Sequence, residues 1–209
     1  MIIDTSLNAC QAGIFRDGEP LGEKVEPMQR GHQERLAPMV AELLDEAGIT
    51  PRALSHVGVT LGPGSFTGLR VGLAFAKGLA AGLGLSLKGI GTLEALGAHS
   101  ALVGRRVLSV IHGGRDHIYV QATGSSPQAF DPADPLAVDV LTGPAAGLVR
   151  DHFPDAEIFT QDWPSLSALA ELALASGHDD VTPLYMRDAD AVVSTRGIIK
   201  LSEGLGVTA

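Results

Sequence analysis

The chain has 209 residues, of which 45% are hydrophobic and 19% are charged, a balance that excludes disorder as the dominant state. The chain has 15 Lys and Arg residues and 24 Asp and Glu residues, and the resulting net charge of −9 argues against unaided binding of a phosphate backbone. The single cysteine, Cys10, excludes an intramolecular disulfide and fits a reducing, cytoplasmic compartment, while the most apolar stretch, residues 71–87, is too short to span a membrane.

Three strand signals open the chain. Residues 1–3 predict a short buried strand, and residues 10–15 and 21–25 predict two more, joined by an Asp-Gly turn that is a strong hairpin signal. A helix is expected next over residues 32–47, because apolar side chains recur there at helical spacing and Gly48 follows in the position of a C-terminal cap.

The signals then alternate between helix and strand. Pro38 is expected to bend the first helix or to mark its first turn. Residues 57–61 predict a fourth strand, which leads through a glycine-rich loop at residues 62–68 into a long helix. A fifth strand near residues 85–90 precedes a helix that starts around Thr92.

The order of these elements indicates an α/β fold. Two hairpin connections followed by alternating strands and helices are typical of a ribonuclease-H-like unit, in which three antiparallel strands extend into a parallel pair. The pattern restarts with strand signals at residues 107–111 and 118–122, so residues 1–105 and 106–209 are expected to form two domains, the second smaller. A helix capped by Ser165 follows, and the last residues can pack back on the first domain.

The glycine-rich loop is the first candidate for chemistry. Backbone N–H groups at a helix N-terminus can receive an anion or a carbonyl oxygen, and glycines permit close approach. The glycine spacing fits neither a Walker loop nor a dinucleotide fingerprint, and a tight turn without a ligand is an equal alternative. Ser65 and Thr67 are expected to hydrogen-bond the turn and to cap the helix. The loop consists of Gly62, Pro63, Gly64, Ser65, Phe66, Thr67 and Gly68, with Arg70 shortly after it.

The long helix has an unusual surface. Small residues recur at every fourth position from Gly68 to Gly84, which lets another backbone come very near, and the chain's own sheet or a neighbouring helix is the commoner cause of such a stripe. Apolar side chains nevertheless surround this helix, and one sheet face cannot cover them all. We therefore expect a hydrophobic subunit interface built with the helix over residues 32–47. Its residues are His32, Arg35, Leu36, Met39, Leu43, Gly72, Phe75, Ala76 and Leu79.

Several stretches of this sequence resemble the TsaB (YeaZ) family. The most specific is GPGSFTGLRVG at residues 62–72, and it is supported by Ile3-Asp4-Thr5 and by HQERLAPM at residues 32–39. PLYMR at residues 183–187 is similar to the family's Pro-x-Tyr-x-Arg motif near its C-terminus. The resemblance covers most of the first hundred residues and is weaker beyond them.

The resemblance implies an actin-like ATPase (ASKHA) fold made of two ribonuclease-H-like halves, the second degenerate. It implies a role in making threonylcarbamoyladenosine beside the tRNA anticodon, as the non-catalytic partner of a TsaD-like catalytic subunit that a TsaE-like ATPase joins. The two N-terminal helices would contact TsaD, or a second copy of the chain when it is alone. tRNA would be reached only through the complex. No cofactor would be tightly bound, which leaves ATP or ADP at the interface of the complex to be tested.

The resemblance also bears on cofactor and metal sites. Asp4 and Thr5 stand where ASKHA enzymes place a phosphate-contacting acid and hydroxyl, which makes them the candidates for nucleotide binding, and the alternative is an Asp that caps its own turn through Ser6. Thr92 and Leu96 align with the metal-binding histidine pair of TsaD-like enzymes, and neither side chain is a metal ligand. We expect no metal site and no catalytic residue.

Two other functions compete with the scaffold role. An independent ATPase or small-molecule kinase of the same fold would show turnover with the purified chain. A glycoprotease-like peptidase needs an activated nucleophile, and Ser65 does not lie in a Gly-x-Ser-x-Gly elbow with a His and an Asp positioned to activate it. His112 and His117, five residues apart around a turn, are expected to be loop or surface residues rather than metal ligands.

Overall fold

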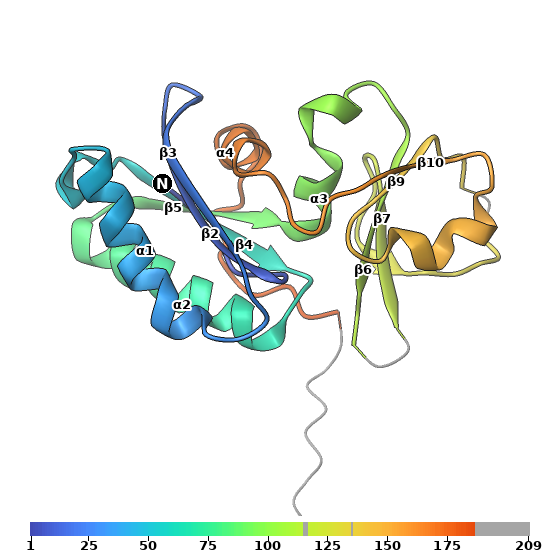
Figure 1. The fold of residues 1–209 in the computed structure, drawn as a ribbon, viewed down its shortest axis with the longest axis horizontal. Helices are drawn as coiled ribbons and strands as arrows, with labels where there is room; N and C mark the ends of the chain where they lie inside the picture. The colour runs from blue at the N-terminus through green and yellow to red at the C-terminus, as the bar shows by residue number, and fades with distance from the viewer. Residues whose placement is uncertain (115–116, 135, 187–209) are drawn as a thin grey trace, which may run out of the picture.

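The computed structural model describes residues 1–114, 117–134 and 136–186, and it contains two five-stranded sheets that lie one after the other along the long axis of the molecule (Figure 1). The α/β class is as predicted. The first sheet consists of β1 (Ile2–Asp4), β2 (Ala9–Arg16), β3 (Glu19–Pro27), β4 (His56–Gly62) and β5 (Ser86–Gly91). The second consists of β6 (Val107–His112), β7 (Ile118–Ala122), β8 (Gln128–Ala129), β9 (Val140–Thr142) and β10 (Glu157–Phe159).

The first sheet has the predicted ribonuclease-H-like order, β3-β2-β1-β4-β5. Ile2 pairs with Gly13 on the antiparallel neighbour β2 and with Gly58 on the parallel neighbour β4. The turn between β2 and β3 places Asp17 and Gly18 at φ angles of 53° and 88°, the left-handed conformation that Asp-Gly hairpins adopt. The hairpin prediction is therefore confirmed.

The second sheet repeats this order in reduced form. Its strands lie in the order β8-β7-β6-β9-β10, with β7 antiparallel and β9 parallel to β6. Strands β8 to β10 have two or three residues each, and a 3-10 helix, η3 (Ala146–His152), connects β9 to β10. The sequence predicted β6 and β7 and missed the other three, because runs of two or three residues are too short to show a period. The degenerate second half is confirmed.

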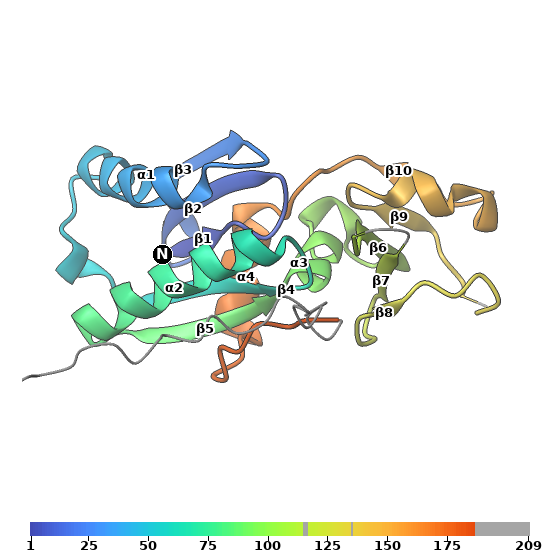
Figure 2. The same ribbon diagram turned by 90° about the horizontal axis from the view of Figure 1, so that it is seen from below.

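Helices cover both faces of the first sheet (Figures 1 and 2). Helices α1 (His32–Glu46) and α2 (Phe66–Leu83) lie side by side on one face, and α4 (Leu166–Ala175) packs on the other. The short α3 (Thr92–Gly97) contacts strands of both sheets. Two 3-10 helices, η1 (Pro51–Ala53) and η2 (Ser100–Leu102), complete the described elements. No helix in the described ranges is both long and apolar enough to cross a membrane.

The helix ends follow the predicted signals. Gly48, just after α1, has a φ of 65°, and the Ser165 hydroxyl accepts a hydrogen bond from the N–H of Ala168 in α4. Pro38 lies inside α1 beyond its first turn, which excludes the first-turn alternative, and the bend at Pro38 stays a prediction. Proline has no backbone N–H, so one carbonyl group in the preceding turn of α1 has no helical hydrogen-bond partner. Pro38 lies on the exposed side of the helix, where water can bond to that carbonyl group.

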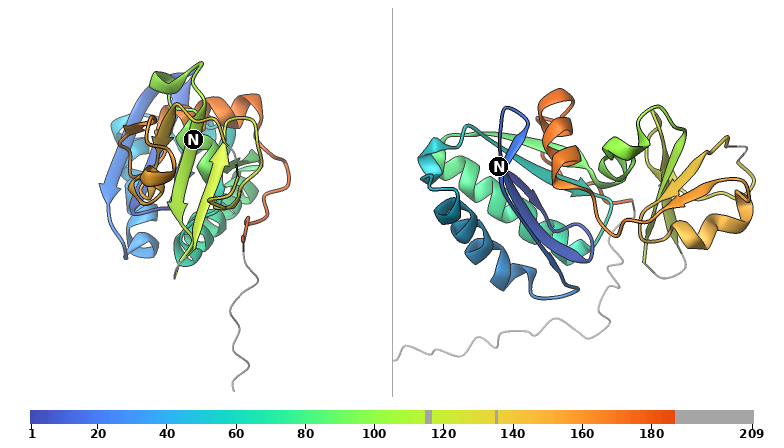
Figure 3. Two further views of the ribbon diagram at one scale, coloured as in Figure 1. Left: turned by 90° about the vertical axis from the view of Figure 1, so that its right-hand side faces the viewer. Right: turned by 45° about the horizontal axis from the view of Figure 1, so that its top comes forward.

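The division into domains at residues 105 and 106 stays a prediction, and the packing of α4 bears on it. Strands β6 to β10 form the second sheet, but α4 returns to the first sheet (Figure 3). Its Leu169 and Ala170 lie in one apolar cluster with Ile90 of β5. The chain then follows the edge of β5, where His178 pairs with Gly89. We expected only the last residues to pack on the first domain, but α4 already does so. The face of the first sheet opposite α1 and α2 is also apolar, and α4 buries it. Of the last residues of the chain, residues 187–209 lie outside the described residues.

Two apolar clusters hold the arrangement together. The larger lies between the first sheet and the pair α1 and α2, and it includes Ile3, Val57 and Val59 of the strands. A smaller cluster connects the two halves, and its members come from the loop between β1 and β2, from α3, from the second sheet and from the last described residues. They are Leu7, Leu93, Leu96, Ile111, Tyr119 and Met186. Each fully buried large side chain contributes about 1.5–3 kcal/mol.

Candidate functional site

The glycine-rich loop connects β4 to α2 and presses against the end of β1. A Cβ atom added at Gly64 would overlap the carbonyl oxygen of Ser6, and one added at Gly68 would overlap that of Thr5. The N–H of Ser65 donates a 2.7 Å hydrogen bond to the same Ser6 oxygen. The glycines are therefore required by the close approach of two backbone segments of the same chain.

The hydroxyl groups of the loop have different roles. The Ser65 Oγ atom accepts a 3.2 Å hydrogen bond from the N–H of Gly68, which confirms the predicted helix cap. Thr67 is exposed, and its hydroxyl makes no hydrogen bond within the described residues. The capping role predicted for Thr67 is wrong, because Ser65 already occupies the position from which a side chain reaches the first free N–H groups.

Asp4 and Thr5, the candidates for nucleotide binding, are buried and bonded inside the chain. The Asp4 carboxylate accepts hydrogen bonds from the Ser6 N–H at 2.8 Å, from Thr60 Oγ1 at 2.7 Å and from Gln11 Nε2 at 2.6 Å. The Thr5 hydroxyl donates to the Gly68 carbonyl oxygen at 2.7 Å. Both side chains are at most 1% exposed. This arrangement corresponds to the alternative, in which Asp4 stabilises its own turn through Ser6.

The two positions that align with the metal pair are buried inside the chain. Thr92 and Leu96 are fully buried in α3, and Leu96 packs in the cluster between the two halves. His112 and His117 flank the turn between β6 and β7 and are exposed, as predicted. Within the described parts of the chain, no group of three or more His, Cys, Asp and Glu side chains is placed to hold a metal ion.

Most of the predicted interface residues lie in the core. Six of them are buried by the chain's own sheet and helices: His32, Leu36, Met39, Leu43, Gly72 and Ala76. Arg35, Phe75 and Leu79 are half-buried. The interface prediction is wrong for the six buried residues, because α1 and α2 pack beside each other and so cover apolar sides of α2 that the sheet alone leaves open. The predicted stripe of small residues faces inward from Gly68 to Ala80, where Gly72 meets the Thr5 side chain, whereas Gly84 at its end is exposed.

A second stripe of small residues faces outward on α2. Ala74, Gly78 and Gly82 follow one another at the same four-residue spacing, and all three are exposed. A Cβ atom added at Gly78 or Gly82 would meet no atom of the described residues within 4 Å. Ala37 and Ala41 are exposed on the neighbouring α1. The spacing was visible in the sequence, but it could not indicate which of the two stripes faces the sheet.

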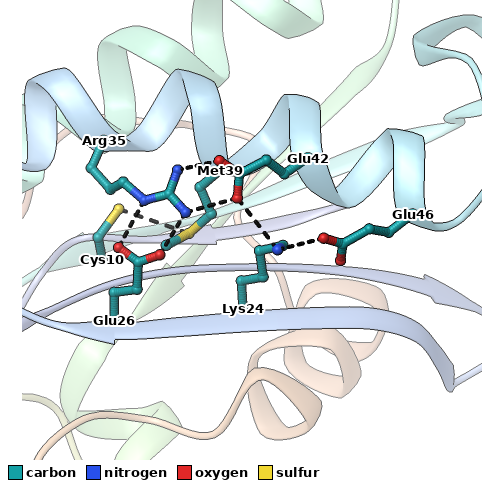
Figure 4. Close-up of polar contacts among 7 residues, drawn as sticks. All are labelled: Cys10, Lys24, Glu26, Arg35, Met39, Glu42 and Glu46. Atoms are coloured by element: carbon teal, nitrogen blue, oxygen red, sulfur yellow. Dashed lines mark hydrogen bonds and ion pairs between the residues drawn. The ribbon is translucent and has the colours of Figure 1, made fainter.

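An ion-pair network fastens α1 to the edge strand β3 (Figure 4). The Arg35 guanidinium on α1 bonds Glu26 of β3 through Nε at 2.7 Å, and it also bonds Glu42, about two helical turns along α1, through Nη1 at 2.7 Å. Lys24 of β3 lies 2.7 Å from Glu46 and 3.3 Å from Glu42. Hydrogen bonds from Arg35 lower the pKa of the Glu42 carboxyl group to about 2.

Beneath this network lies the only cysteine of the chain. The Cys10 Sγ atom is 4.0 Å from the Met39 Sδ atom, and both side chains are fully buried (Figure 4). Burial raises the pKa of the Cys10 thiol to about 11, since a thiolate is disfavoured in apolar surroundings. Cys10 is therefore a packing residue and not a nucleophile.

Comparison with known proteins identifies the family. The family model described as "TsaD: tRNA N6-adenosine threonylcarbamoyltransferase" matches residues 25–146, which include α1, the glycine-rich loop and α2. An uncharacterized protein of Mycobacterium tuberculosis is 35% identical over 201 residues, which are 91% of this chain and 92% of that protein.

Named relatives and solved structures agree with this match. The tRNA threonylcarbamoyladenosine biosynthesis protein TsaB of Bacillus subtilis is 28% identical over 202 residues, which cover 95% of this chain and 78% of that protein. The structure of YeaZ from Pseudomonas aeruginosa superimposes with a TM-score of 0.74 at 25% identity and covers 88% of this chain and 97% of that one. With this fold, this motif loop and these relatives, the chain belongs to the TsaD family and is a TsaB-like (YeaZ-like) member of it.

Proposed function

We propose that this chain acts in the synthesis of threonylcarbamoyladenosine on tRNA, as a subunit that binds and activates a TsaD-like catalytic subunit. The names of its relatives support the pathway, since TsaB of B. subtilis is described as a tRNA threonylcarbamoyladenosine biosynthesis protein. The net charge of −9 supports a role in which the partner supplies most of the contacts to tRNA phosphates.

The observation that carries the proposal is the outward face of α1 and α2. Two exposed glycines inside a helix, Gly78 and Gly82, together cost about 2 kcal/mol of helix propensity, and no close contact of the described residues requires a glycine at either position. Small residues on neighbouring helices let a second pair of helices approach closely. We infer that this face, defined by Ala37, Ala41 and the stripe from Ala74 to Gly82, receives the TsaD-like subunit, or a second copy of the chain when it is alone.

The chain is proposed to be non-catalytic on its own. The carboxylate oxygens of Asp4 are engaged by three donors of the chain itself, which disfavours the alternative of an independent ATPase or small-molecule kinase. Ser65 caps α2, which disfavours a peptidase nucleophile. A TsaE-like ATPase, and ATP or ADP at the boundary between subunits, complete the proposed complex, and tRNA binds only to the whole assembly.

Titration calorimetry with the TsaD-like subunit of the same organism tests this proposal. The wild-type chain is expected to bind, and Ala74→Arg is expected to abolish binding because it places a long charged side chain on the outward face. Ala175→Arg is the matched control, since Ala175 is exposed on α4, on the other side of the sheet. It is expected to bind like the wild type.

The same variants are then used in a reconstituted tRNA modification assay. Formation of the modified base is expected only when the chain and the TsaD-like subunit are both present, and only Ala74→Arg should prevent it. Modification by the chain alone, or nucleotide turnover by the chain alone, would contradict the non-catalytic role. Equal binding by Ala74→Arg and Ala175→Arg would contradict the proposed face.

A further inference from the structure

Three side chains form an exposed cluster where α2 begins. Phe66 and Tyr185 are 46% and 42% exposed, and their ring centroids lie 5.3 Å apart. The guanidinium carbon of Arg70 lies 3.7 Å from the centroid of the Phe66 ring. Its Nε atom donates a 3.2 Å hydrogen bond to the Tyr185 hydroxyl. The cluster therefore joins α2 to a segment more than a hundred residues later in the chain.

The position of Tyr185 is set by the backbone next to the glycine-rich loop. The N–H of Leu184 donates a 2.7 Å hydrogen bond to the carbonyl oxygen of Leu61, at the end of β4. A Cβ atom at Gly62 would lie 2.9 Å from the Leu184 carbonyl oxygen, so the two segments are in close contact. Arg70 is thus held by stacking on the Phe66 ring and by its hydrogen bond to the Tyr185 hydroxyl, which reduces the entropy lost when it binds a partner group.

Arg70 retains its two terminal nitrogens for a further bond. Tyr185 engages Nε, and no carboxylate among the described residues pairs with the guanidinium. The other arginines with defined contacts are neutralised inside the chain: Arg35 by two glutamates, Arg105 by Glu157 and Arg106 by Asp139. A guanidinium with free Nη1 and Nη2 atoms presents the fork that matches both oxygens of one carboxylate.

The cluster continues into the proposed partner face. Phe66, Arg70, Ala74, Lys77 and Ala81 follow one another at steps of three or four residues and are all exposed, so they form one line along α2. Arginine and aromatic side chains are the residue types that dominate the binding energy of protein interfaces. The planar guanidinium fork matches the two oxygens of a carboxylate, so an Asp or Glu side chain of the partner is the anion that fits this exposed cluster.

We propose that Arg70, held by Phe66 and Tyr185, anchors the partner subunit by binding an Asp or Glu carboxylate through Nη1 and Nη2. This inference rests on the proposed function and adds to it the chemistry that the partner must supply. Lys77, further along the same line, contributes a second positive charge to the face. The contact lies at the N-terminal end of α2 and fixes the register of the two subunits along the helix.

The test is the affinity of the full-length chain for the TsaD-like subunit, measured by titration calorimetry at low and high salt. Arg70→Ala is expected to weaken binding about 30-fold, as truncation of an interface anchor does. Arg70→Lys is expected to weaken it about tenfold, because lysine keeps the charge but lacks the planar fork. Arg52→Ala, an exposed residue of η1 with the same change of charge, is expected to change affinity less than about twofold.

A charge exchange identifies the partner group. Arg70→Glu is expected to abolish binding, and one Asp→Arg or Glu→Arg substitution in the partner is expected to restore it. Equal affinity of wild type, Arg70→Ala and Arg70→Lys would overturn the inference while leaving the proposed function intact. Loss of anticodon stem-loop RNA binding by Arg70→Ala, with partner binding unchanged, would overturn it in favour of a phosphate. Absence of any binding by the wild-type chain would overturn both proposals.

Discussion

The hydroxyl of Thr5, at the end of β1, donates a 2.7 Å hydrogen bond to the carbonyl oxygen of Gly68, in the first turn of α2. The same two residues touch through their backbones, since a side chain at Gly68 would overlap the Thr5 carbonyl oxygen. The glycine-rich motif therefore allows the start of α2 to pack closely against the end of β1. The opposite, outward side of α2 is the surface that we propose for the partner subunit.

Alanine substitutions on the two sides of α2 are expected to have opposite effects on stability. Gly68→Ala forces a methyl group against backbone atoms and is expected to lower the free energy of unfolding by about 1–3 kcal/mol. Gly78→Ala adds a methyl group in open space and improves helix propensity, so it is expected to raise that free energy by about 0.5–1 kcal/mol. Urea unfolding of both variants measures these changes, and equal effects would contradict the assignment of the inward and outward sides.

Asp4→Asn is expected to destabilise the fold by about 1–3 kcal/mol, because one of its three donors would then face an amide N–H₂ group instead of an oxygen. Asp17→Asn is the control, since Asp17 is exposed in the β2–β3 turn at a φ of 53°, which asparagine also adopts. Thermal unfolding compares the two variants. A stability of Asp4→Asn equal to wild type, together with loss of ATP binding in calorimetry, would instead assign Asp4 to a nucleotide.

The network around Arg35 is expected to make stability depend on acid pH. The pKa of Glu42 is lowered from 4.5 to about 2 in the folded chain, so its contribution is fully present above about pH 4.5 and is lost as the pH falls towards 2. Glu42→Gln removes this contribution and is expected to be less stable than wild type at neutral pH and to lose less stability on acidification. Chemical unfolding over this pH range measures the difference.

Glu34→Gln provides the control for that experiment. Glu34 is exposed on the same helix and has no ion pair among the described residues. Its variant is expected to follow the wild-type pH profile. If Glu34→Gln and Glu42→Gln show the same profile, the network does not contribute to the acid dependence.

Cys10 is expected to resist thiol reagents in the folded chain. It is fully buried, and its pKa of about 11 leaves little thiolate at about pH 8. A disulfide reagent should label it only after unfolding in urea, with one equivalent released per chain. Rapid stoichiometric labelling of the folded protein would show that the region between α1 and the sheet opens readily.

The elements of the first half could be predicted from sequence because their signals are local. The Asp-Gly turn, Gly48 after α1 and the apolar spacing of residues 32–47 each report on the backbone at their own position. Strands β8, β9 and β10 could not be predicted in the same way, since they depend on pairing with β7, β6 and β9 respectively, and they carry too few residues to show a period. The return of α4 to the first sheet is likewise a tertiary effect.

The candidate site was only partly predictable, for a related reason. A helix with apolar residues all round gives no indication of which side is buried. The stripe through Gly72 and Ala76 and the stripe through Ala74 and Gly78 have the same spacing, and only the fold shows that the first faces Thr5 while the second faces outward. The cluster of Phe66, Arg70 and Tyr185 depends on a contact over 115 positions, which no local pattern reveals.

The central claim is that the outward face of α1 and α2 receives the partner subunit. Hydrogen–deuterium exchange of the chain, alone and with the TsaD-like subunit, tests it most directly. The account predicts slower exchange in peptides from residues 32–46 and 66–83 when the partner is present, with no change in the second sheet. Protection confined to residues 107–159 or to α4, with α1 and α2 unchanged, would contradict it.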